Sequence, residues 1–371
     1  MRFLLLFIVC LFFWQLPVQA GLRIGIILPL SGKEAQRGEA IRAFLLELNQ
    51  RFYLRHGLHF DLRFYDSKAK PSRVSKLVKE AFFDGVGAII GPFNPAGASH
   101  LYQAAQKFKI PVVITTGEIN PIKYLREPIG PVFRTGLSSR MAVKVIYRCL
   151  QRQGFHRIGL LLTNDAFGRE GERWLTAYAT EYAIKIVAKR YFGTHDTDVT
   201  VHLRALLSCE AVVCWAPPRS SAIVARNLSQ EALNLPVFFS HQVAWEGFLR
   251  REAGLYGRPF VGAAFLAGDA APIDPQISVL YQAFRQRFDF LRDPVLAAFA
   301  DAFLFVKIGA LRAGYAYWSR GLEQAGLVRG LTGLYFLSKD DHYGLLPGSV
   351  GVFRYRWSGY DPVCPPRAGV L

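Results

Sequence analysis

Apolar runs alternate with amphipathic segments along most of the chain. The runs at 22–28 and 86–90 are long enough for buried strands, and 58–66 alternates as a strand does. Between them, residues 34–52 and 71–84 carry apolar side chains at helical spacing. Strands that alternate with helices in this way predict a doubly wound α/β lobe with a parallel sheet.

The stretch from residue 89 to residue 118 completes this lobe. A strand ends at Pro92, Asn94 is a candidate helix N-cap, and Pro95 suits the first helical position, where its missing N–H costs nothing. The helix leads into a second strand at 110–114. The polar loops that follow the two strands would lie at the carboxyl edge of the sheet, where α/β folds bind ligands, although an ordinary βαβ crossover without a ligand explains the same pattern.

The alternation restarts after a helix at 138–153. Strands are expected at 157–163, 184–191, 211–215 and 237–239, and the helices between them at 169–182, 199–207 and 220–232. Long helical segments follow at 275–290 and 294–313, and the tail at 333–362 is predicted to form strands with turns. The restart indicates a second α/β lobe, which agrees with a length too great for one ordinary core.

The first twenty residues differ from the rest. Arg2 precedes an apolar segment at 3–14. Val18-Gln19-Ala20 resembles the small-residue motif at which signal peptides are cleaved. This pattern is typical of a secretory signal peptide, with an uncleaved anchor as the alternative. We therefore expect export to the periplasm.

The formal net charge is +17, with lysines and arginines scattered along the chain and no nucleic-acid motif. For an exported protein we interpret this charge as a solvated surface that attracts anionic membranes, envelope polymers or acidic solutes. No nucleic-acid partner is expected.

Four cysteines remain after the leader: Cys149, Cys209, Cys214 and Cys364. An oxidising compartment permits disulfides. A strand between Cys209 and Cys214 would hold their Cα atoms too far apart for a bond, and no other potential zinc ligands accompany them. We expect at most one disulfide and favour reduced, buried thiols.

No catalytic motif stands out. The sequence lacks a phosphate-binding P-loop, a GxSxG elbow, an HExxH helix and a glycine-rich dinucleotide loop. His195 beside Asp196 fits a solvated loop better than a base with its orienting acid, and Asp165 with Glu170 fits a loop acid followed by a helix first-turn acid. We therefore expect no enzyme activity, no cofactor and no metal, and an exported hydrolase stays as a distant alternative.

Several loose motifs in a fixed order carry a family resemblance. They are IGIILPLSG at 24–32, IGP at 90–92, IPVV at 110–113, NDAFG at 164–168, TD at 197–198 and GLTGL at 330–334. Together they resemble the type I periplasmic binding proteins of the leucine/isoleucine/valine-binding group. The resemblance implies two Rossmann-like lobes joined by three hinge strands, with a small ligand clamped between them and delivered to an ABC-type membrane permease.

The resemblance also implies domain boundaries. Residues 1–20 would be the signal peptide, 21–136 plus 268–331 the first lobe, and 137–267 plus 332–371 the second lobe. The protein is expected to be a monomer. A ligand-sensing receptor of the same fold that reports to a signalling partner is the alternative to transport.

The family's site residues map onto this chain with departures. In the first lobe, Pro95 stands where the family has a serine that binds the ligand carboxylate. The matching positions in that lobe are Pro95, and Thr116 with Glu118, and the candidates beside them are Asn94, Ala96, Gly97 and Thr115. In the second lobe Phe167 keeps the family's aromatic ring, while Pro217 and Gln242 depart from its pattern. Trp215 and His241 are their neighbours, which a slightly shifted alignment would bring into these two places. Neutral Gln242 stands where the family has the acid that pairs with an ammonium group. We therefore expect a ligand with a carboxylate or amide and an apolar body rather than a branched-chain amino acid bound in the family's usual way.

Overall fold

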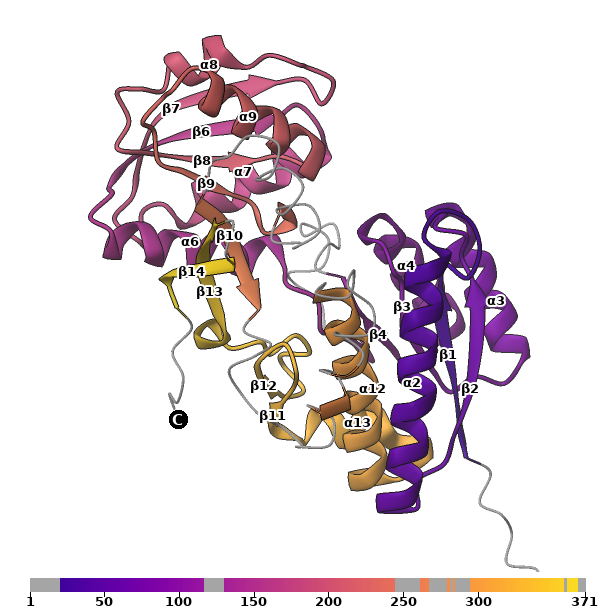
Figure 1. Ribbon diagram of the computed structural model, residues 1–371. Coiled ribbons are helices and arrows are strands. Elements are labelled where there is room, and N and C mark those ends of the chain that lie inside the picture. The colour runs from indigo at the N-terminus through magenta and orange to yellow at the C-terminus, as the bar shows by residue number, and fades with distance from the viewer. Residues whose placement is uncertain are drawn as a thin grey trace, which may run out of the picture.

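The computed structural model describes residues 21–116, 130–243, 261–266, 279–280, 283, 294–356 and 359–365 (Figure 1). Two large sheets, each flanked by helices, organise these residues, and a small hairpin accompanies them. The predicted fold class, two doubly wound α/β lobes, is confirmed.

The first sheet is parallel, with strand order β2-β1-β3-β4-β5. Its elements in chain order are β1 (Leu22–Leu28), α2 (Ala35–His56), β2 (Phe60–Asp66), η1 (Pro71–Arg73), α3 (Val74–Phe83), β3 (Ala88–Gly91), η2 (Pro95–Gly97), α4 (Ala98–Phe108), β4 (Val112–Ile114) and β5 (Val132–Arg134). Alternate residues of β1 face opposite ways: Ile26 packs in the core under α2, while Ile27 packs in the core under α3 and α4. Both faces are therefore covered, as a parallel sheet requires.

The second sheet has the order β14-β13-β10-β9-β8-β6-β7, with parallel pairing from β10 to β7 and antiparallel pairing of β13 and β14 at one edge. Its elements are α6 (Ser139–Arg152), β6 (Arg157–Thr163), α7 (Ala166–Tyr178), β7 (Lys185–Phe192), α8 (Thr200–Arg204), β8 (Ala211–Trp215), α9 (Pro218–Gln230), β9 (Val237–Phe239), η3 (His241–Val243), β10 (Val261–Leu266), η6 (Pro347–Ser349), β13 (Val350–Arg356) and β14 (Gly359–Cys364). Helices α6 and α7 contribute to the core on one face of this sheet, and α8 and α9 to the core on the other.

The remaining elements are α12 (Pro294–Ala313), η5 (Tyr315–Tyr317), α13 (Trp318–Glu323) and the hairpin β11 (Gly326–Arg329) with β12 (Leu334–Leu337). Helix α12 has the bounds predicted for it and packs against α2, β3 and β4 of the first lobe. The predicted helix at 275–290 falls almost wholly outside the described residues. The domain boundaries remain predictions.

A buried hydrogen-bond network joins α12 to the segment that follows β5 and to the hairpin β11–β12. The Thr135 hydroxyl, just after β5, donates to the Ala298 carbonyl on α12 at 2.8 Å, and the Tyr335 hydroxyl donates to the Thr135 carbonyl at 3.1 Å. Asp301 on α12 accepts from the amides of Leu331 and Thr332 at 2.5 and 2.9 Å. Hydrogen bonds in the core therefore hold α12 against the chain at Thr135 and against the β11–β12 hairpin.

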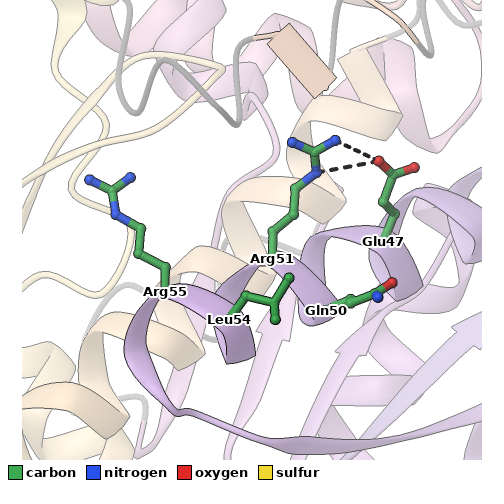
Figure 2. Close-up of a pocket in the computed structure, with 5 residues that line it drawn as sticks. All are labelled: Glu47, Gln50, Arg51, Leu54 and Arg55. Atoms are coloured by element: carbon green, nitrogen blue, oxygen red, sulfur yellow. Dashed lines mark hydrogen bonds and ion pairs between the residues drawn. The ribbon is translucent and has the colours of Figure 1, made fainter.

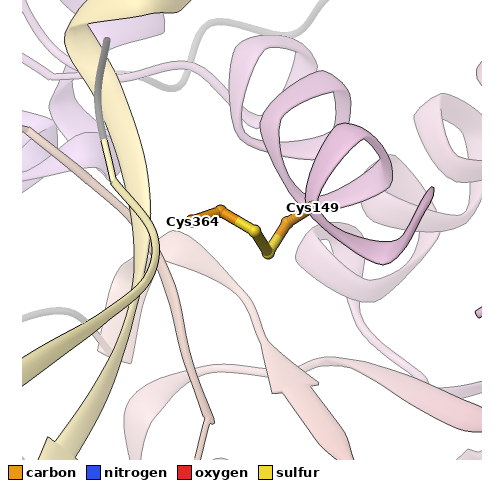
Figure 3. Close-up of a disulfide and its surroundings, with 2 residues drawn as sticks. All are labelled: Cys149 and Cys364. Atoms are coloured by element: carbon orange, nitrogen blue, oxygen red, sulfur yellow. A yellow bond between two sulfur atoms is a disulfide. The ribbon is translucent and has the colours of Figure 1, made fainter. Parts of the chain in front are cut away.

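Cys149 and Cys364 form a disulfide (Figure 3). One bond agrees with the expectation of at most one disulfide but contradicts the preference for four reduced thiols. Their Cα atoms are 5.7 Å apart although 215 residues separate them in sequence. The expectation was wrong because the contact exists only after β14 has paired at the sheet edge beside α6. Cys209 and Cys214 are free and buried, as expected for residues at the two ends of one strand.

Candidate ligand-binding site

In the first lobe, the predicted site residues lie at the carboxyl edge of the sheet. Asn94 caps η2 as predicted, because its Oδ1 accepts from the Gly97 amide at 3.1 Å, and its Nδ2 donates to the Ala69 carbonyl at 3.1 Å. Pro95 and Ala96 are exposed and Gly97 is buried. An anion that bound the Gly97 amide would therefore have to replace the Asn94 cap, and Ala96 offers the more accessible position.

The two threonines after β4 differ. The Thr115 hydroxyl donates to the Pro92 carbonyl at 2.7 Å, so it joins this strand end to the loop that leads into η2. Thr116 is also buried, but its hydroxyl has no hydrogen-bond partner among the described residues. A buried polar group without a partner is costly, which makes Thr116 the better candidate for contact with a ligand. Glu118 lies outside the described residues.

Arg37 is a first-lobe cation that the sequence reasoning missed. Its guanidinium lies 4.7 Å from the centroid of the Phe93 ring, directly before the Asn94 cap, and pairs with Glu34 at 2.9 Å. Burial lowers its pKa from the usual value of 12.5, yet an arginine stays charged at neutral pH. A sequence signal was present: Arg37 is in the first turn of α2, where a cation opposes the helix dipole and needs another reason to be there.

In the second lobe, three of the predicted residues form an aromatic cluster. The Phe167 and Trp215 ring centroids are 5.7 Å apart, and His241 lies 6.1 Å from Phe167 and 5.7 Å from Trp215. They come from the start of α7, the end of β8 and η3, which follows β9. The structure therefore brings together residues that are 26 or more positions apart.

Trp215 forms the base of this cluster. It is fully buried, and a Cβ added at Gly171 would lie 2.2 Å from its indole ring, so α7 packs directly on the tryptophan. Its Nε1 has no hydrogen-bond partner among the described residues. Trp215 is therefore mainly a core residue that supports Phe167 and His241.

The cluster carries no formal charge at neutral pH. Burial lowers the pKa of His241 to about 4, so its imidazole is neutral at pH 7. Pro217 occupies the N-cap position of α9, and Gln242 is a half-buried neutral residue in η3. These positions offer no side-chain carboxylate to an ammonium group.

The acids of α7 serve local structure. Asp165 caps the helix by accepting from the Gly168 amide at 2.8 Å, so α7 begins at Ala166, three residues before the predicted start. Glu170 bonds to Ser139 on α6, and burial raises its pKa although Arg134 acts in the opposite direction. Among the described residues, no group of three histidine, cysteine or acidic side chains could hold a metal ion, and no helix has the length and apolarity to span a membrane.

Comparison with known proteins places the chain in a family. Residues 21–342 match the sequence profile of a family described as periplasmic binding protein. No curated protein sequence matches.

Solved structures share the fold across nearly the whole chain. One is an ABC transporter solute-binding protein from Rhodopseudomonas palustris in complex with benzoate, with a TM-score of 0.68, 16% identity, and coverage of 94% of this chain and 98% of that one. Another is a branched-chain amino acid transporter substrate-binding protein from Streptococcus pneumoniae in complex with isoleucine, with a TM-score of 0.70, 15% identity, and coverage of 93% and 100%. A type 1 periplasmic binding protein from Bordetella pertussis gives a TM-score of 0.73 at 17% identity, with coverage of 94% and 100%. The predicted resemblance is confirmed: the chain belongs to the periplasmic binding protein family, type I.

Proposed function

We propose that this protein is an exported, monomeric solute-binding protein that captures a small organic anion with an apolar body and delivers it to an ABC-type permease. The anion would bind in the first lobe, beside Arg37, Thr116 and the start of η2. Its apolar body would contact the aromatic cluster of the second lobe, defined as Phe167, Trp215 and His241. Closure of the lobes would be stabilised by a ligand that contacts both of them.

The observation that carries this proposal is the charge asymmetry between the two halves of the site. The first-lobe half contains the partly buried Arg37 guanidinium, which lies on Phe93 and pairs with Glu34, and the second-lobe half has a neutral histidine and a neutral Gln242. An unpaired buried charge is costly. A ligand ammonium would have no partner at these second-lobe positions, whereas a ligand carboxylate would share the several N–H donors of the Arg37 guanidinium with Glu34. The structural likeness to proteins crystallised with benzoate and with isoleucine shows that this fold accommodates both kinds of ligand.

A ligand screen tests the proposal. Calorimetry would compare leucine, isoleucine and valine with aromatic carboxylates and the corresponding amides. We expect the aromatic carboxylates to bind and the branched-chain amino acids to bind far more weakly. Micromolar or tighter binding of a branched-chain amino acid that is unaffected by Glu118→Gln would contradict the proposed ligand class.

Sensing is the second candidate within the same fold, and transport without catalysis remains our preference. Both transport and sensing require the lobes to close on the ligand. Small-angle scattering with and without a bound carboxylate tests this closure. An unchanged radius of gyration at saturating ligand would contradict closure. Uptake by vesicles that contain a cognate permease would then separate transport from signalling.

A further inference from the structure

Exposed aromatic and apolar side chains gather at the end of the first lobe opposite the candidate ligand site. We call this the amino-terminal surface and define it by Tyr53, Leu54, Phe82, Phe83 and Tyr317, all of them exposed. Phe83 is 72% and Leu54 is 75% exposed. Together they form a candidate interaction surface.

Contacts near the starts of the strands show that these residues share one end of the lobe. A Cβ at Gly21, directly before β1, would lie 2.3 Å from the His59 carbonyl oxygen, and the His59 ring lies 5.9 Å from the Tyr53 ring. On the other side of β1, the Arg23 guanidinium donates to the carbonyl of Asp84, directly after Phe83. The carboxyl-terminal end of α2 lies at the same end of the first lobe as the start of β1 (Figure 1).

The short helical region after α12 extends the same end. The Tyr315 hydroxyl accepts from the His59 amide at 3.0 Å, and the Trp318 indole donates to the Gly87 carbonyl at 3.0 Å, just before β3. Tyr317 lies between these two anchored residues in the sequence. Its exposed ring therefore belongs to the amino-terminal surface.

Cations accompany the exposed rings. The Lys79 ammonium lies 6.0 Å from the Phe83 ring centroid and the Arg320 guanidinium 5.7 Å from that of Tyr317. Phe108, whose ring is 5.1 Å from Phe82, has Lys107 at 5.8 Å. On α2, a surface hollow is lined by Leu54, Arg55 and Arg51, and the Arg51 guanidinium pairs with Glu47 in the same hollow at 2.7 Å (Figure 2).

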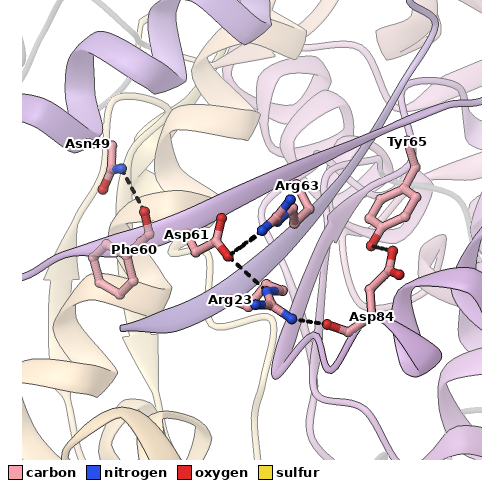
Figure 4. Close-up of polar contacts among 7 residues, drawn as sticks. All are labelled: Arg23, Asn49, Phe60, Asp61, Arg63, Tyr65 and Asp84. Atoms are coloured by element: carbon pink, nitrogen blue, oxygen red, sulfur yellow. Dashed lines mark hydrogen bonds and ion pairs between the residues drawn. The ribbon is translucent and has the colours of Figure 1, made fainter. Parts of the chain in front are cut away.

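Two acids at this end, Asp61 and Asp84, have polar partners. Asp61 pairs with Arg23 at 2.8 Å and with Arg63 at 3.0 Å, and the hydrogen bond from Arg23 helps to lower its pKa (Figure 4). Asp84 accepts from the Tyr65 hydroxyl at 2.7 Å. The surface thus combines exposed rings with basic groups, a pattern typical of proteins that rest on the headgroup region of anionic membranes.

The sequence before Gly21 indicates what this surface meets. The apolar segment at 3–14 is separated from Gly21 by only the six residues 15–20, which can span at most about 20 Å when extended. We expect that segment to be in the membrane during export, and it would hold the amino-terminal surface of the tethered, folded lobe within this distance of the bilayer. The position of the expected signal peptide and the positive charge of the surface therefore both indicate an anionic membrane as the partner.

We propose that the amino-terminal surface binds the headgroup region of an anionic phospholipid bilayer. The leader brings this end of the lobe to the membrane, and the rings and cations maintain a weaker, salt-sensitive contact after cleavage. This contact is independent of the ligand and of the candidate site at the opposite edge of the sheet.

The test uses the exported protein and two labelled variants. Phe83→Cys and, as a control of similar exposure on α8 of the second lobe, Val201→Cys (Val201 is 78% exposed) would each carry an environment-sensitive fluorophore. Cys209 and Cys214 are buried, and burial raises their thiol pKa values, so the label reacts with the introduced cysteine.

With vesicles containing phosphatidylglycerol, we expect a blue shift at position 83 and none at position 201. Pure phosphatidylcholine vesicles should give little shift, and added salt should weaken the effect. In vesicle co-sedimentation, Phe82→Ser/Phe83→Ser should lower the partition coefficient about tenfold, and removal of Lys79 or Lys107 should lower it about fivefold each. Thermal unfolding verifies that each variant is folded. If the Phe82→Ser/Phe83→Ser variant does not fold, the two lysine variants still test the proposal.

Other occupants give different results. Equal binding to neutral and anionic vesicles, or equal shifts at positions 83 and 201, would overturn the proposal. Unchanged binding in all the serine and lysine variants would show that a retained leader alone holds the protein. A shift at position 83 that grows with protein concentration in the absence of lipid would assign the surface to a second copy of the chain and equally overturn the proposal.

Discussion

Cys149 on α6 is covalently joined to Cys364 at the end of β14, so the disulfide fixes the final strand of the second sheet to a helix formed 215 residues earlier. Both side chains are in the main core. The bond therefore closes a loop that contains β6 to β13, most of the second lobe, together with α12 of the first.

Replacement of the disulfide by two serines should destabilise the protein. We expect Cys149→Ser/Cys364→Ser to lower the free energy of unfolding by about 2 to 5 kcal/mol, because the unfolded chain is no longer restrained. Urea unfolding measures this change, and Cys209→Ser serves as a control that leaves the bond intact. Thiol titration of denatured, unreduced protein should find two thiols in residues 21–371, and four would contradict the bond.

Asp301 should make stability depend on pH. Burial raises its pKa from the usual 3.8 to about 6, against the opposing effect of its hydrogen bonds to Thr332 and Leu331. Because the folded state retains this proton at a pH where the unfolded state has lost it, the contribution of Asp301 to stability is largest below pH 4 and is lost as the pH rises to about 6. The loss is on the order of 3 kcal/mol for a shift of this size.

The measurement is urea unfolding of the wild type and Asp301→Asn at a series of pH values. The difference between the two free energies of unfolding should change between pH 4 and pH 6.5 in favour of the variant, and then remain constant. A difference that does not vary over this range would show that Asp301 has an ordinary pKa in the folded protein.

Gly171→Ala should disturb the aromatic cluster by displacing Trp215, which packs against α7. The new methyl group would lie 2.2 Å from the Trp215 indole, so the ring or α7 must move. We expect a loss of about 1 to 3 kcal/mol in unfolding free energy and weaker binding of an aromatic carboxylate. Gly348→Ala is the matched control, since a Cβ there meets no atom within 4 Å; equal effects of the two substitutions would contradict the packing argument.

The sequence predicted the local features well, because they depend on neighbouring residues. The Asn94 cap, the βαβ unit from β3 to β4 and the bounds of α12 all follow from capping chemistry and hydrophobic spacing. The start of α7 was placed too late because Asp165 forms a cap where a longer loop was expected.

Features that depend on distant contacts were harder to predict. The partner of Cys149 is determined by the docking of β14, and no local pattern encodes that distance. Trp215 and Phe167 were proposed through the family resemblance, and His241 also through its place at the carboxyl end of a strand. Their mutual contacts arise only when three strand ends meet. Arg37 was missed because an arginine in an amphipathic helix usually faces solvent, whereas here Phe93 covers it.

Arg37 should discriminate between a carboxylate and an amide. We expect Arg37→Gln to weaken the binding of an aromatic carboxylate about 10- to 100-fold, because a hydrogen bond to a charged group contributes about 1.5 to 3 kcal/mol. The binding of the corresponding neutral amide should be nearly unaffected.

The chain offers a close control in Arg42. This arginine also pairs with an acid three residues earlier, Glu39, and also lies on an aromatic ring, Phe64, but it is more exposed. Arg42→Gln removes the same charge from the same helix, so it reports any general loss of positive potential. Calorimetry of both ligands with both variants gives the four values required. If the two variants weaken carboxylate binding equally, or if Arg37→Gln weakens the amide as much as the acid, Arg37 does not bind the ligand's charge.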